Sequence, residues 1–171
     1  MWLKGNDPVI DINEIVHQLA VNAEAIRVLV QAISDQQAEW QPNPDTWSMA
    51  KVMEHMYNEE RIDFRQHLKE MLHDPPQPWG AFRDEYLSVP SCRQALDRFW
   101  AERQASITWL EALDSPDWEI QSQVSFGPHN ETITLSAGDV LVSWVDHDFS
   151  HLRQMIKWLH AWHEQESAPY S

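Results

Sequence analysis

Cysteine and glycine are both scarce in this sequence of 171 residues. The one cysteine, Cys92, excludes a disulfide within the chain, which is typical of proteins in a reducing compartment. The four glycines never occur in the spacing that wraps a phosphate group, so the sequence offers no nucleotide-binding loop. A chain of this length can bury enough apolar surface to fold without disulfides or a structural metal. We therefore expect a single domain over residues 1–171, in which any bound metal serves function.

Positive charge is scarce as well. Twelve Lys and Arg residues stand against 27 Asp and Glu, a formal net charge of -15, and the basic residues form no cluster. Nucleic acids and anionic membranes are therefore poor partners. No segment reaches the roughly 18 consecutive apolar residues of a membrane-spanning helix, and the opening MWLKGNDPVIDINE lacks the apolar stretch of a signal peptide. We expect a cytoplasmic protein.

The sequence is rich in helical periodicity. In four long segments, apolar residues recur at intervals of three and four, which places them on one face of a helix. Serines at 48, 91 and 136 are good N-caps, and Asp-Pro or Ser-Pro sequences follow the second and third segments. The predicted helices run from Ile12 to about Ser34, from Ser48 to about His73, from Ser91 to about Leu113, and from Ser136 to about Glu166.

Two connections between these helices are informative. Residues 74–90 contain four prolines and can reach about 55 Å when extended, whereas a 26-residue helix is about 39 Å long. This segment can therefore cross the bundle and start the third helix parallel to the second. Residues 121–135 alternate weakly around Gly127-Pro128-His129-Asn130, which indicates a short β-hairpin. The predicted fold is all-α, a four-helix bundle with one long crossover connection and a possible β-hairpin before the last helix.

Two histidines stand one turn apart on the last predicted helix. His147, His151 and the nearby Gln154 all lean in one direction, in the same arc as Trp144 and Trp158, so this face is partly interior. Imidazoles at positions i and i+4 can bind one metal ion, which would also stabilise them in the neutral form when buried. Ordinary packing explains a single pair equally well. His160 and His163, in contrast, should point to solvent.

A third metal ligand would have to come from another element. The candidates are His17, His55, His67, His73 and His129. His55 is best placed, because it lies near the apolar edge set by Val52 and Met56, with Glu59 one turn further on. His17 and His67 have the pattern of solvent-facing residues, whereas His73 and His129 lie beside turns.

Two motifs together resemble a known family. WSMAKVMEH (47–55), followed much later by SAGDVLVSWVDHDFSHLRQM (136–155), is similar to the DinB/YfiT-like superfamily of four-helix metal-binding proteins. In that family a Trp-Ser pair opens a helix that leads to a first histidine, and a late H-x-x-x-H with a trailing Gln supplies two more. The resemblance extends to about residue 160, although Lys51 replaces the family's helix-start acid. It implies that His55, His147 and His151 hold a divalent ion, zinc or nickel, with water completing the coordination.

The resemblance also implies a chemistry. Three protein ligands with one open position are typical of catalytic zinc sites, where the metal lowers the pKa of bound water or of a thiol. Family members with assigned activities include thiol-dependent transferases and isomerases, so the chain is expected to be a low-molecular-weight thiol S-transferase or a metal-dependent hydrolase. Glu59 is the candidate acid or base, and Gln154 the candidate partner of bound water or substrate. Asp148 is first an orienting group, with a direct catalytic role as the alternative. Local contacts to an anionic substrate are open to Arg61, Arg65, Arg83, Arg93 and Arg153.

The competing hypothesis is a non-catalytic metal-binding or stress-response interaction module. Ten tryptophans suit an interface between subunits, and we expect a homodimer. A small thiol is the expected cosubstrate if the protein is a transferase. A third possibility is that Cys92, at a helix start where a thiolate is favoured, is itself reactive.

Overall fold

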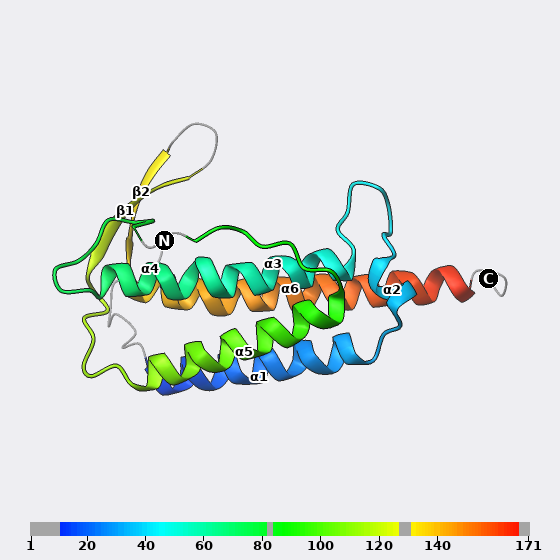
Figure 1. Cartoon of the computed structure of the whole chain (residues 1–171), viewed down its shortest axis with the longest axis horizontal. Coiled ribbons are helices and arrows are strands. Elements are labelled where there is room, and N and C mark those ends of the chain that lie inside the picture. The colour runs from blue at the N-terminus through cyan, green and yellow to red at the C-terminus, as the bar shows by residue number, and fades with distance from the viewer. Residues whose placement is uncertain (1–10, 82–83, 127–130, 168–171) are drawn as a thin grey trace, which may run out of the picture.

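The computed structural model describes residues 11–81, 84–126 and 131–167, and it is a four-helix bundle with a short extra helix and a two-stranded hairpin (Figure 1). The elements are α1 (Ile12–Gln31), α2 (Asp35–Glu39), α3 (Met49–Ile62), α4 (Phe64–Met71), α5 (Cys92–Glu111), β1 (Gln121–Phe126), β2 (Glu131–Ser136) and α6 (Ala137–Ser167). The predicted fold class is confirmed, including the hairpin. The predicted turn at 127–130 lies outside the described residues. None of the described helices is long and apolar enough to cross a lipid bilayer.

Side-chain caps fix where the helices begin. The hydroxyl of Ser48 accepts a hydrogen bond from the backbone N–H of Lys51 at 3.2 Å, and that of Ser91 accepts one from Gln94 at 3.3 Å. Ser136 and Asp139 form the reciprocal capping box that the sequence predicts, with bonds of 2.8 and 3.0 Å between each side chain and the other's N–H. These caps satisfy backbone donors that the helix leaves free.

Two helix boundaries differ from the prediction. The expected helix from Ser48 to His73 is interrupted at Asp63, whose φ of -113° and ψ of -96° are not helical. Its carboxylate contacts His67, and a short acidic side chain that bonds locally competes with regular helix geometry. The short helix α2 was not predicted. Its signal was nevertheless present, because Ser34 and Gln37 form a complete capping box.

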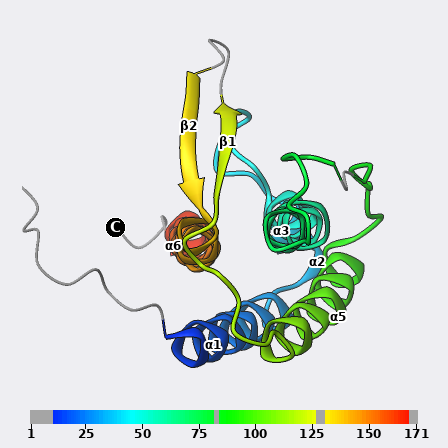
Figure 2. The same cartoon turned by 90° about the vertical axis from the view of Figure 1, so that its left-hand side faces the viewer.

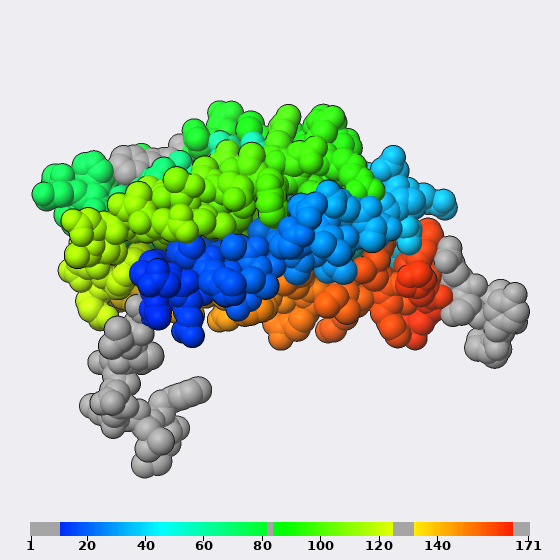
Figure 3. All heavy atoms as spheres, turned by 90° about the horizontal axis from the view of Figure 1, so that it is seen from below, coloured from blue at the N-terminus to red at the C-terminus, as the bar shows by residue number. Residues whose placement is uncertain are grey.

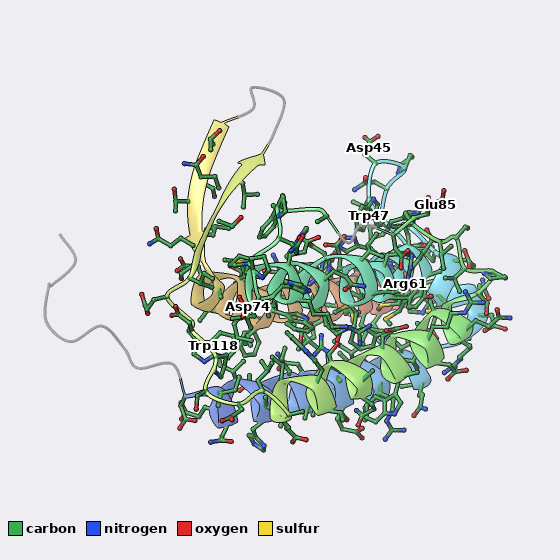
Figure 4. The ribbon with its side chains drawn as sticks, turned by 60° about the vertical axis from the view of Figure 1, so that its left-hand side comes forward. Asp45, Trp47, Arg61, Asp74, Glu85 and Trp118 are labelled. Atoms are coloured by element: carbon green, nitrogen blue, oxygen red, sulfur yellow. The ribbon has the colours of Figure 1, made fainter. Side chains whose placement is uncertain are left out.

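The order of the helices is set by the long crossover. After α4, the chain returns along the bundle, so that α5 runs parallel to α3 and α4, while α1 and α6 run the other way (Figure 1). Polar side chains of α3 hold the connecting segment that returns along the bundle. Asn58 accepts from the N–H of Leu87 at 2.8 Å and donates to its carbonyl at 2.9 Å. Arg61 bonds to Asp84 at 3.1 Å and to the carbonyl of Glu85. Figure 4 labels Arg61 and Glu85 among the side chains.

The four long helices pack around a polar layer that crosses the middle of the bundle. α1 packs on α5 and α6, and seen from below it lies between them (Figure 3). α3 packs mainly on α5, and α3 and α6 lie on the side away from α1 and α5 (Figure 2). One apolar cluster surrounds Phe99 and Trp158, and the other surrounds Leu110 and Trp144. Between them, each of the four long bundle helices contributes a buried polar residue: Asn22, Glu60, Arg103 and Asp148.

Candidate metal centre

Three histidines from two helices meet in the bundle. The Nε2 atom of His147 lies 3.1 Å from Nε2 of His55 and 3.2 Å from Nε2 of His151. All three ligand atoms are within 4.8 Å of one another. An ion bound to imidazole nitrogens at 2.0–2.1 Å in tetrahedral geometry separates those nitrogens by about 3.3 Å. Two of the three separations therefore match those around one bound ion, and the third is no more than 4.8 Å.

The second ring nitrogen of two of these histidines has an oxygen partner. Nδ1 of His151 is 2.9 Å from Oε1 of Gln154, and Nδ1 of His55 is 3.4 Å from Oε1 of Glu59. An oxygen acceptor at Nδ1 favours the tautomer with its proton there, which leaves the Nε2 lone pair free to bind a metal. Two of the three residues that were predicted to assist the site, Glu59 and Gln154, therefore lie directly beside its ligands.

The electrostatics of the group also favour a metal. Burial, and after it the charge of neighbouring histidines, lowers the pKa of His55 to about 4 and that of His147 to about 3. Burial likewise lowers the pKa of His151. All three imidazoles are then neutral at neutral pH, so a metal can bind without first displacing protons.

A chain of titratable groups runs from His55 along α3 and α4. Burial and a hydrogen bond with Asp63 raise the pKa of Glu59 to about 8. Burial alone would raise the pKa of Asp63, but hydrogen bonds from His67 and Glu59 hold it below its usual value. Nε2 of His67 is 3.0 Å from Asp63, and Nδ1 is 2.8 Å from Glu70. Glu59 therefore holds a proton next to the candidate site near neutral pH.

The other histidines lie apart from this group. His17, His73, His160 and His163 are exposed, and His129 lies outside the described residues. The prediction that His67 faces solvent is wrong, because its side chain is only 12% exposed. The reason is that the chain after α4 folds back, which stacks Trp79 on the His67 ring at 3.7 Å between ring centres.

Asp148 lies in the buried polar layer rather than in the histidine group. Both of its oxygens accept from Arg103, at 2.7 and 2.9 Å, and Asn22 donates to it at 3.3 Å. Arg103 also donates to Glu60 at 2.8 Å, and Glu60 accepts from the indole N–H of Trp144 at 3.0 Å. Because Asp148 follows His147 in the chain, this network fixes the position of α6 at the candidate site. It ties α6 to α1, α3 and α5.

Arg103 and Glu60 were missed by the sequence reasoning, although a signal existed. The buried residues of α5 include Leu96, Phe99, Ser106 and Leu110, spaced by three, seven and four. Arg103 falls at the missing position of that stripe. A charged residue on an apolar stripe predicts a buried ion pair with a partner on a facing helix.

The reactive-cysteine alternative is contradicted. Cys92 is 5% exposed and belongs to the apolar cluster around Phe99. Burial raises the pKa of its thiol to about 11, so the thiolate is scarce at neutral pH. Its place at a helix start does not offset the loss of hydration.

Fold and side chains together define the class of this protein: a four-helix bundle with a long crossover and three convergent histidines. The model of the DinB superfamily matches residues 18–155, a span that includes all three histidines. The chain belongs to the DinB superfamily.

A solved structure agrees with this fold. It is YfiT from Bacillus subtilis, described as a probable metal-dependent hydrolase with an unusual four-helix bundle topology. The two folds align with a TM-score of 0.60 over 91% of this chain and 93% of that one, at 13% sequence identity. At that identity the likeness concerns the fold alone. No curated protein matches the sequence.

Proposed function

We propose that this protein is a metal-dependent hydrolase whose divalent ion is held by His55, His147 and His151. The observation that carries the proposal is the meeting of three neutral imidazoles with Nε2 spacings of 3.1 and 3.2 Å. A divalent ion held by three imidazoles lowers the pKa of a water molecule beside it. Nitrogen ligands of this kind suit zinc or nickel.

The surroundings of the histidines support catalysis over a purely structural site. Within the described parts of the chain, the group contains three ligating residues and no fourth. Structural zinc sites are closed by four protein ligands, whereas catalytic ones keep a position for water or substrate. The three side chains are only partly buried, so a small molecule has access.

Residues next to the ligands have roles in this proposal. Glu59 holds or releases a proton at its carboxyl group, 3.4 Å from His55, and is the acid or base. Gln154 orients His151 and can also contact a substrate. Asp148 has a positioning role, because its bonds with Arg103 hold α6, which carries His147 and His151, in place. The YfiT description as a probable metal-dependent hydrolase is consistent with this assignment.

Activation of a low-molecular-weight thiol is the second candidate function of the same site. A metal lowers the pKa of a coordinated thiol just as it lowers that of water. The two reactions differ in the nucleophile, so a direct comparison of water and thiol acceptors separates them.

The decisive experiment begins with metal content. We expect about one equivalent of zinc or nickel in the purified protein and a loss of that metal in H55A, H147A and H151A, measured by elemental analysis. The matched control is H160A, because His160 is an exposed histidine on the same helix. Circular dichroism checks that each variant is folded. Retention of metal in folded H147A or H151A would refute the proposed site.

The reaction is then tested with the metal-loaded protein. Activated esters and amides serve as hydrolase substrates, and small thiols with an electrophilic acceptor serve as transferase substrates. Metal-dependent turnover of the first group supports the hydrolase, and turnover of the second group alone favours thiol transfer. Absence of turnover in both would favour a non-catalytic metal-binding module.

We further propose that the protein is a homodimer that pairs along α6. Val142, Phe149 and Ile156 are spaced by seven residues on this helix and are 43%, 41% and 56% exposed. Such a stripe on one helix face is typical of helix pairing. Analytical ultracentrifugation should give twice the monomer mass for the wild type, and I156S should shift the equilibrium to monomer. A wild-type protein that is monomeric at micromolar concentration would contradict the proposed dimer.

A further inference from the structure

A pocket of about 510 Å³ lies beside the candidate metal centre, between α6 and the loop that connects α2 to α3. It is lined by Pro42, Thr46, Trp47, Ser150, Arg153, Gln154, Lys157, Trp158 and Ala161. Its size is within the range of pockets that hold small organic ligands. In Figure 4 the loop projects from the helices, with Asp45 at its tip and Trp47 nearer to the bundle.

The lining of this pocket directly contacts the histidine group. Gln154 lies in the wall of the pocket and bonds to Nδ1 of His151 at 2.9 Å. The ring of Trp47 is 5.1 Å from the ring of His55, measured between ring centres. The pocket and the candidate metal centre are therefore neighbours that share Gln154.

The charge of the pocket is opposite to that of the chain. The formal net charge of the protein is -15, yet the lining contains two cations, Arg153 and Lys157, and no acid. Among the described residues, neither cation forms an ion pair. Arg153 contacts Ser150 at 3.4 Å. Asp146 lies two turns before it and lines a neighbouring hollow, which Arg153 and Ser150 also line.

Of the other four arginines considered for substrate contact, three already bond to groups of the protein, and one lies outside the described residues. Arg61 bonds to Asp84 and to the carbonyl of Glu85, and Arg65 pairs with Glu102. Arg93 donates to the carbonyl of Ile33 at 2.7 Å. Arg83 lies outside the described residues. Arg153 is thus the one of these five that the described structure leaves available beside the histidines.

Two indoles give the pocket apolar walls. The N–H of Trp158 donates to the carbonyl of Trp40 at 3.1 Å, and the two rings meet edge to face at 5.2 Å. Trp158 is therefore held in place and presents a fixed surface. Trp47, on the loop side of the lining, is 42% exposed, whereas Trp158, on α6, is 5% exposed. Flat rings of this kind favour a planar apolar group in the ligand.

We propose that this pocket binds an organic carboxylate, with the carboxylate on Arg153 and Lys157 and a planar apolar part between the indoles. The inference rests on the proposed function, because it places the substrate of the metal centre in this pocket. Arginine recognises a carboxylate with two parallel hydrogen bonds, and lysine adds a second positive charge. The pocket offers side-chain cations without a helix N-terminus, which suits a single negative charge better than a phosphate.

The first test measures binding without turnover. The zinc-loaded protein is titrated with 2-naphthoate and with 2-naphthamide, which share shape and differ in charge, while the indole N–H signals are followed by NMR. We expect 2-naphthoate to bind about tenfold more tightly, with the largest shifts at the signals of Trp47 and Trp158. In R153Q/K157Q this preference should fall to about twofold or less.

The control variant is K69Q/R98Q, which removes the same charge from other faces of the molecule. Lys69 and Arg98 lie over the rings of Trp109 and Tyr57, outside the pocket lining. This control should retain the preference for 2-naphthoate. Equal binding of both probes to the wild type, or an equal loss in the control, would overturn the inference.

The second test separates the pocket from the reaction. Hydrolysis of 4-acetoxybenzoate and of 4-acetoxybenzamide consumes one water and releases acetate and the corresponding phenol. We expect kcat/KM to be about tenfold higher for the carboxylate, mainly through KM, and to lose this ratio in R153Q/K157Q. If neither ester is hydrolysed while the probes still discriminate, the hydrolase proposal fails and the pocket stands. Turnover without a preference for the carboxylate would refute the pocket and leave the hydrolase.

Discussion

Each imidazole of the site depends on what its second ring nitrogen contacts. Gln154 at 2.9 Å from His151 favours the tautomer with a free lone pair at Nε2. Substitution of Gln154 by Leu removes this acceptor at nearly the same volume. We expect the zinc affinity of Q154L to fall by about tenfold to a hundredfold. Competition with a chelator of known affinity measures the change, and Q154E, which keeps an oxygen acceptor, should stay close to the wild type.

Glu59 is the neighbouring group with the most displaced pKa. Burial and the hydrogen bond with Asp63 raise its pKa to about 8. If Glu59 transfers a proton in the reaction, E59Q should reduce kcat by about a hundredfold or more and leave the bound metal in place. Steady-state kinetics with elemental analysis of the same sample measure both effects. Unchanged kcat would assign Glu59 a supporting role only.

The pH dependence of metal binding follows from the lowered pKa values of the histidines. A proton competes with the metal only when the pH approaches the pKa of the ligand in the folded protein. With pKa values of about 4 for His55 and about 3 for His147, both stay neutral at pH 5.5. Three histidines with ordinary pKa values of about 6.5 would lose affinity on the order of a thousandfold between pH 7.5 and 5.5.

We therefore expect the zinc affinity to fall by about a hundredfold or less between pH 7.5 and 5.5, because His55 and His147 stay neutral there and burial also lowers the pKa of His151. Most of this decrease comes from the proton on Glu59, whose pKa of about 8 a nearby cation would lower. Equilibrium dialysis with elemental analysis at both pH values gives the answer. A loss near a thousandfold would show that the imidazoles are solvated as in a free peptide.

The histidine positions were predictable because their spacing and order are written in the sequence. His147 and His151 share a helix face by simple periodicity, and the family resemblance selected His55 from five candidates. Periodicity also predicts that Asp148 lies on the apolar face of the last helix. What could not be predicted was the partner of Asp148, because Arg103 is 45 residues away and only the packing of α5 against the other helices brings it close.

Among the elements, the crossover is held by side chains of one helix. Asn58 is fully buried, and its amide satisfies both the N–H and the carbonyl of Leu87. We expect N58A to lower the free energy of unfolding by about 1–3 kcal/mol, because it leaves two partly buried backbone groups without these partners. Urea denaturation measures the loss. The exposed N43A serves as the control, and an equal effect in both would contradict this role.

The break between α3 and α4 could not be read from periodicity. The apolar pattern continues through residue 63, with Met56, Leu68 and Met71 all buried. The interruption arises from contacts of the Asp63 side chain with Glu59 and His67, which compete with regular helix geometry. Periodicity reports which face is buried and is insensitive to a single non-helical residue. The length of the crossover, in contrast, was sufficient to predict the parallel arrangement of α3 and α5.

For the whole molecule, the buried polar layer is a strong determinant of stability. Arg103 is 1% exposed and pairs with two carboxylates that are 1% exposed or less. Substitution by Met leaves Glu60 and Asp148 buried without a cation, which should cost about 3–5 kcal/mol of unfolding free energy. Chemical denaturation measures this cost for R103M. The exposed R98M serves as the control and should change stability by less than about 1 kcal/mol. A small effect in R103M would mean that water reaches the layer.

The two helices that supply the histidines pack mainly on other partners, α3 on α5 and α6 on α1 and α4. An ion bound to His55, His147 and His151 would thus join α3 and α6 directly, in addition to the buried polar network around Arg103. Proteases act on transiently opened forms, and a ligand that binds only the closed form makes opening rarer. The lifetime of the protein would therefore depend on metal supply, with the metal-depleted form degraded first.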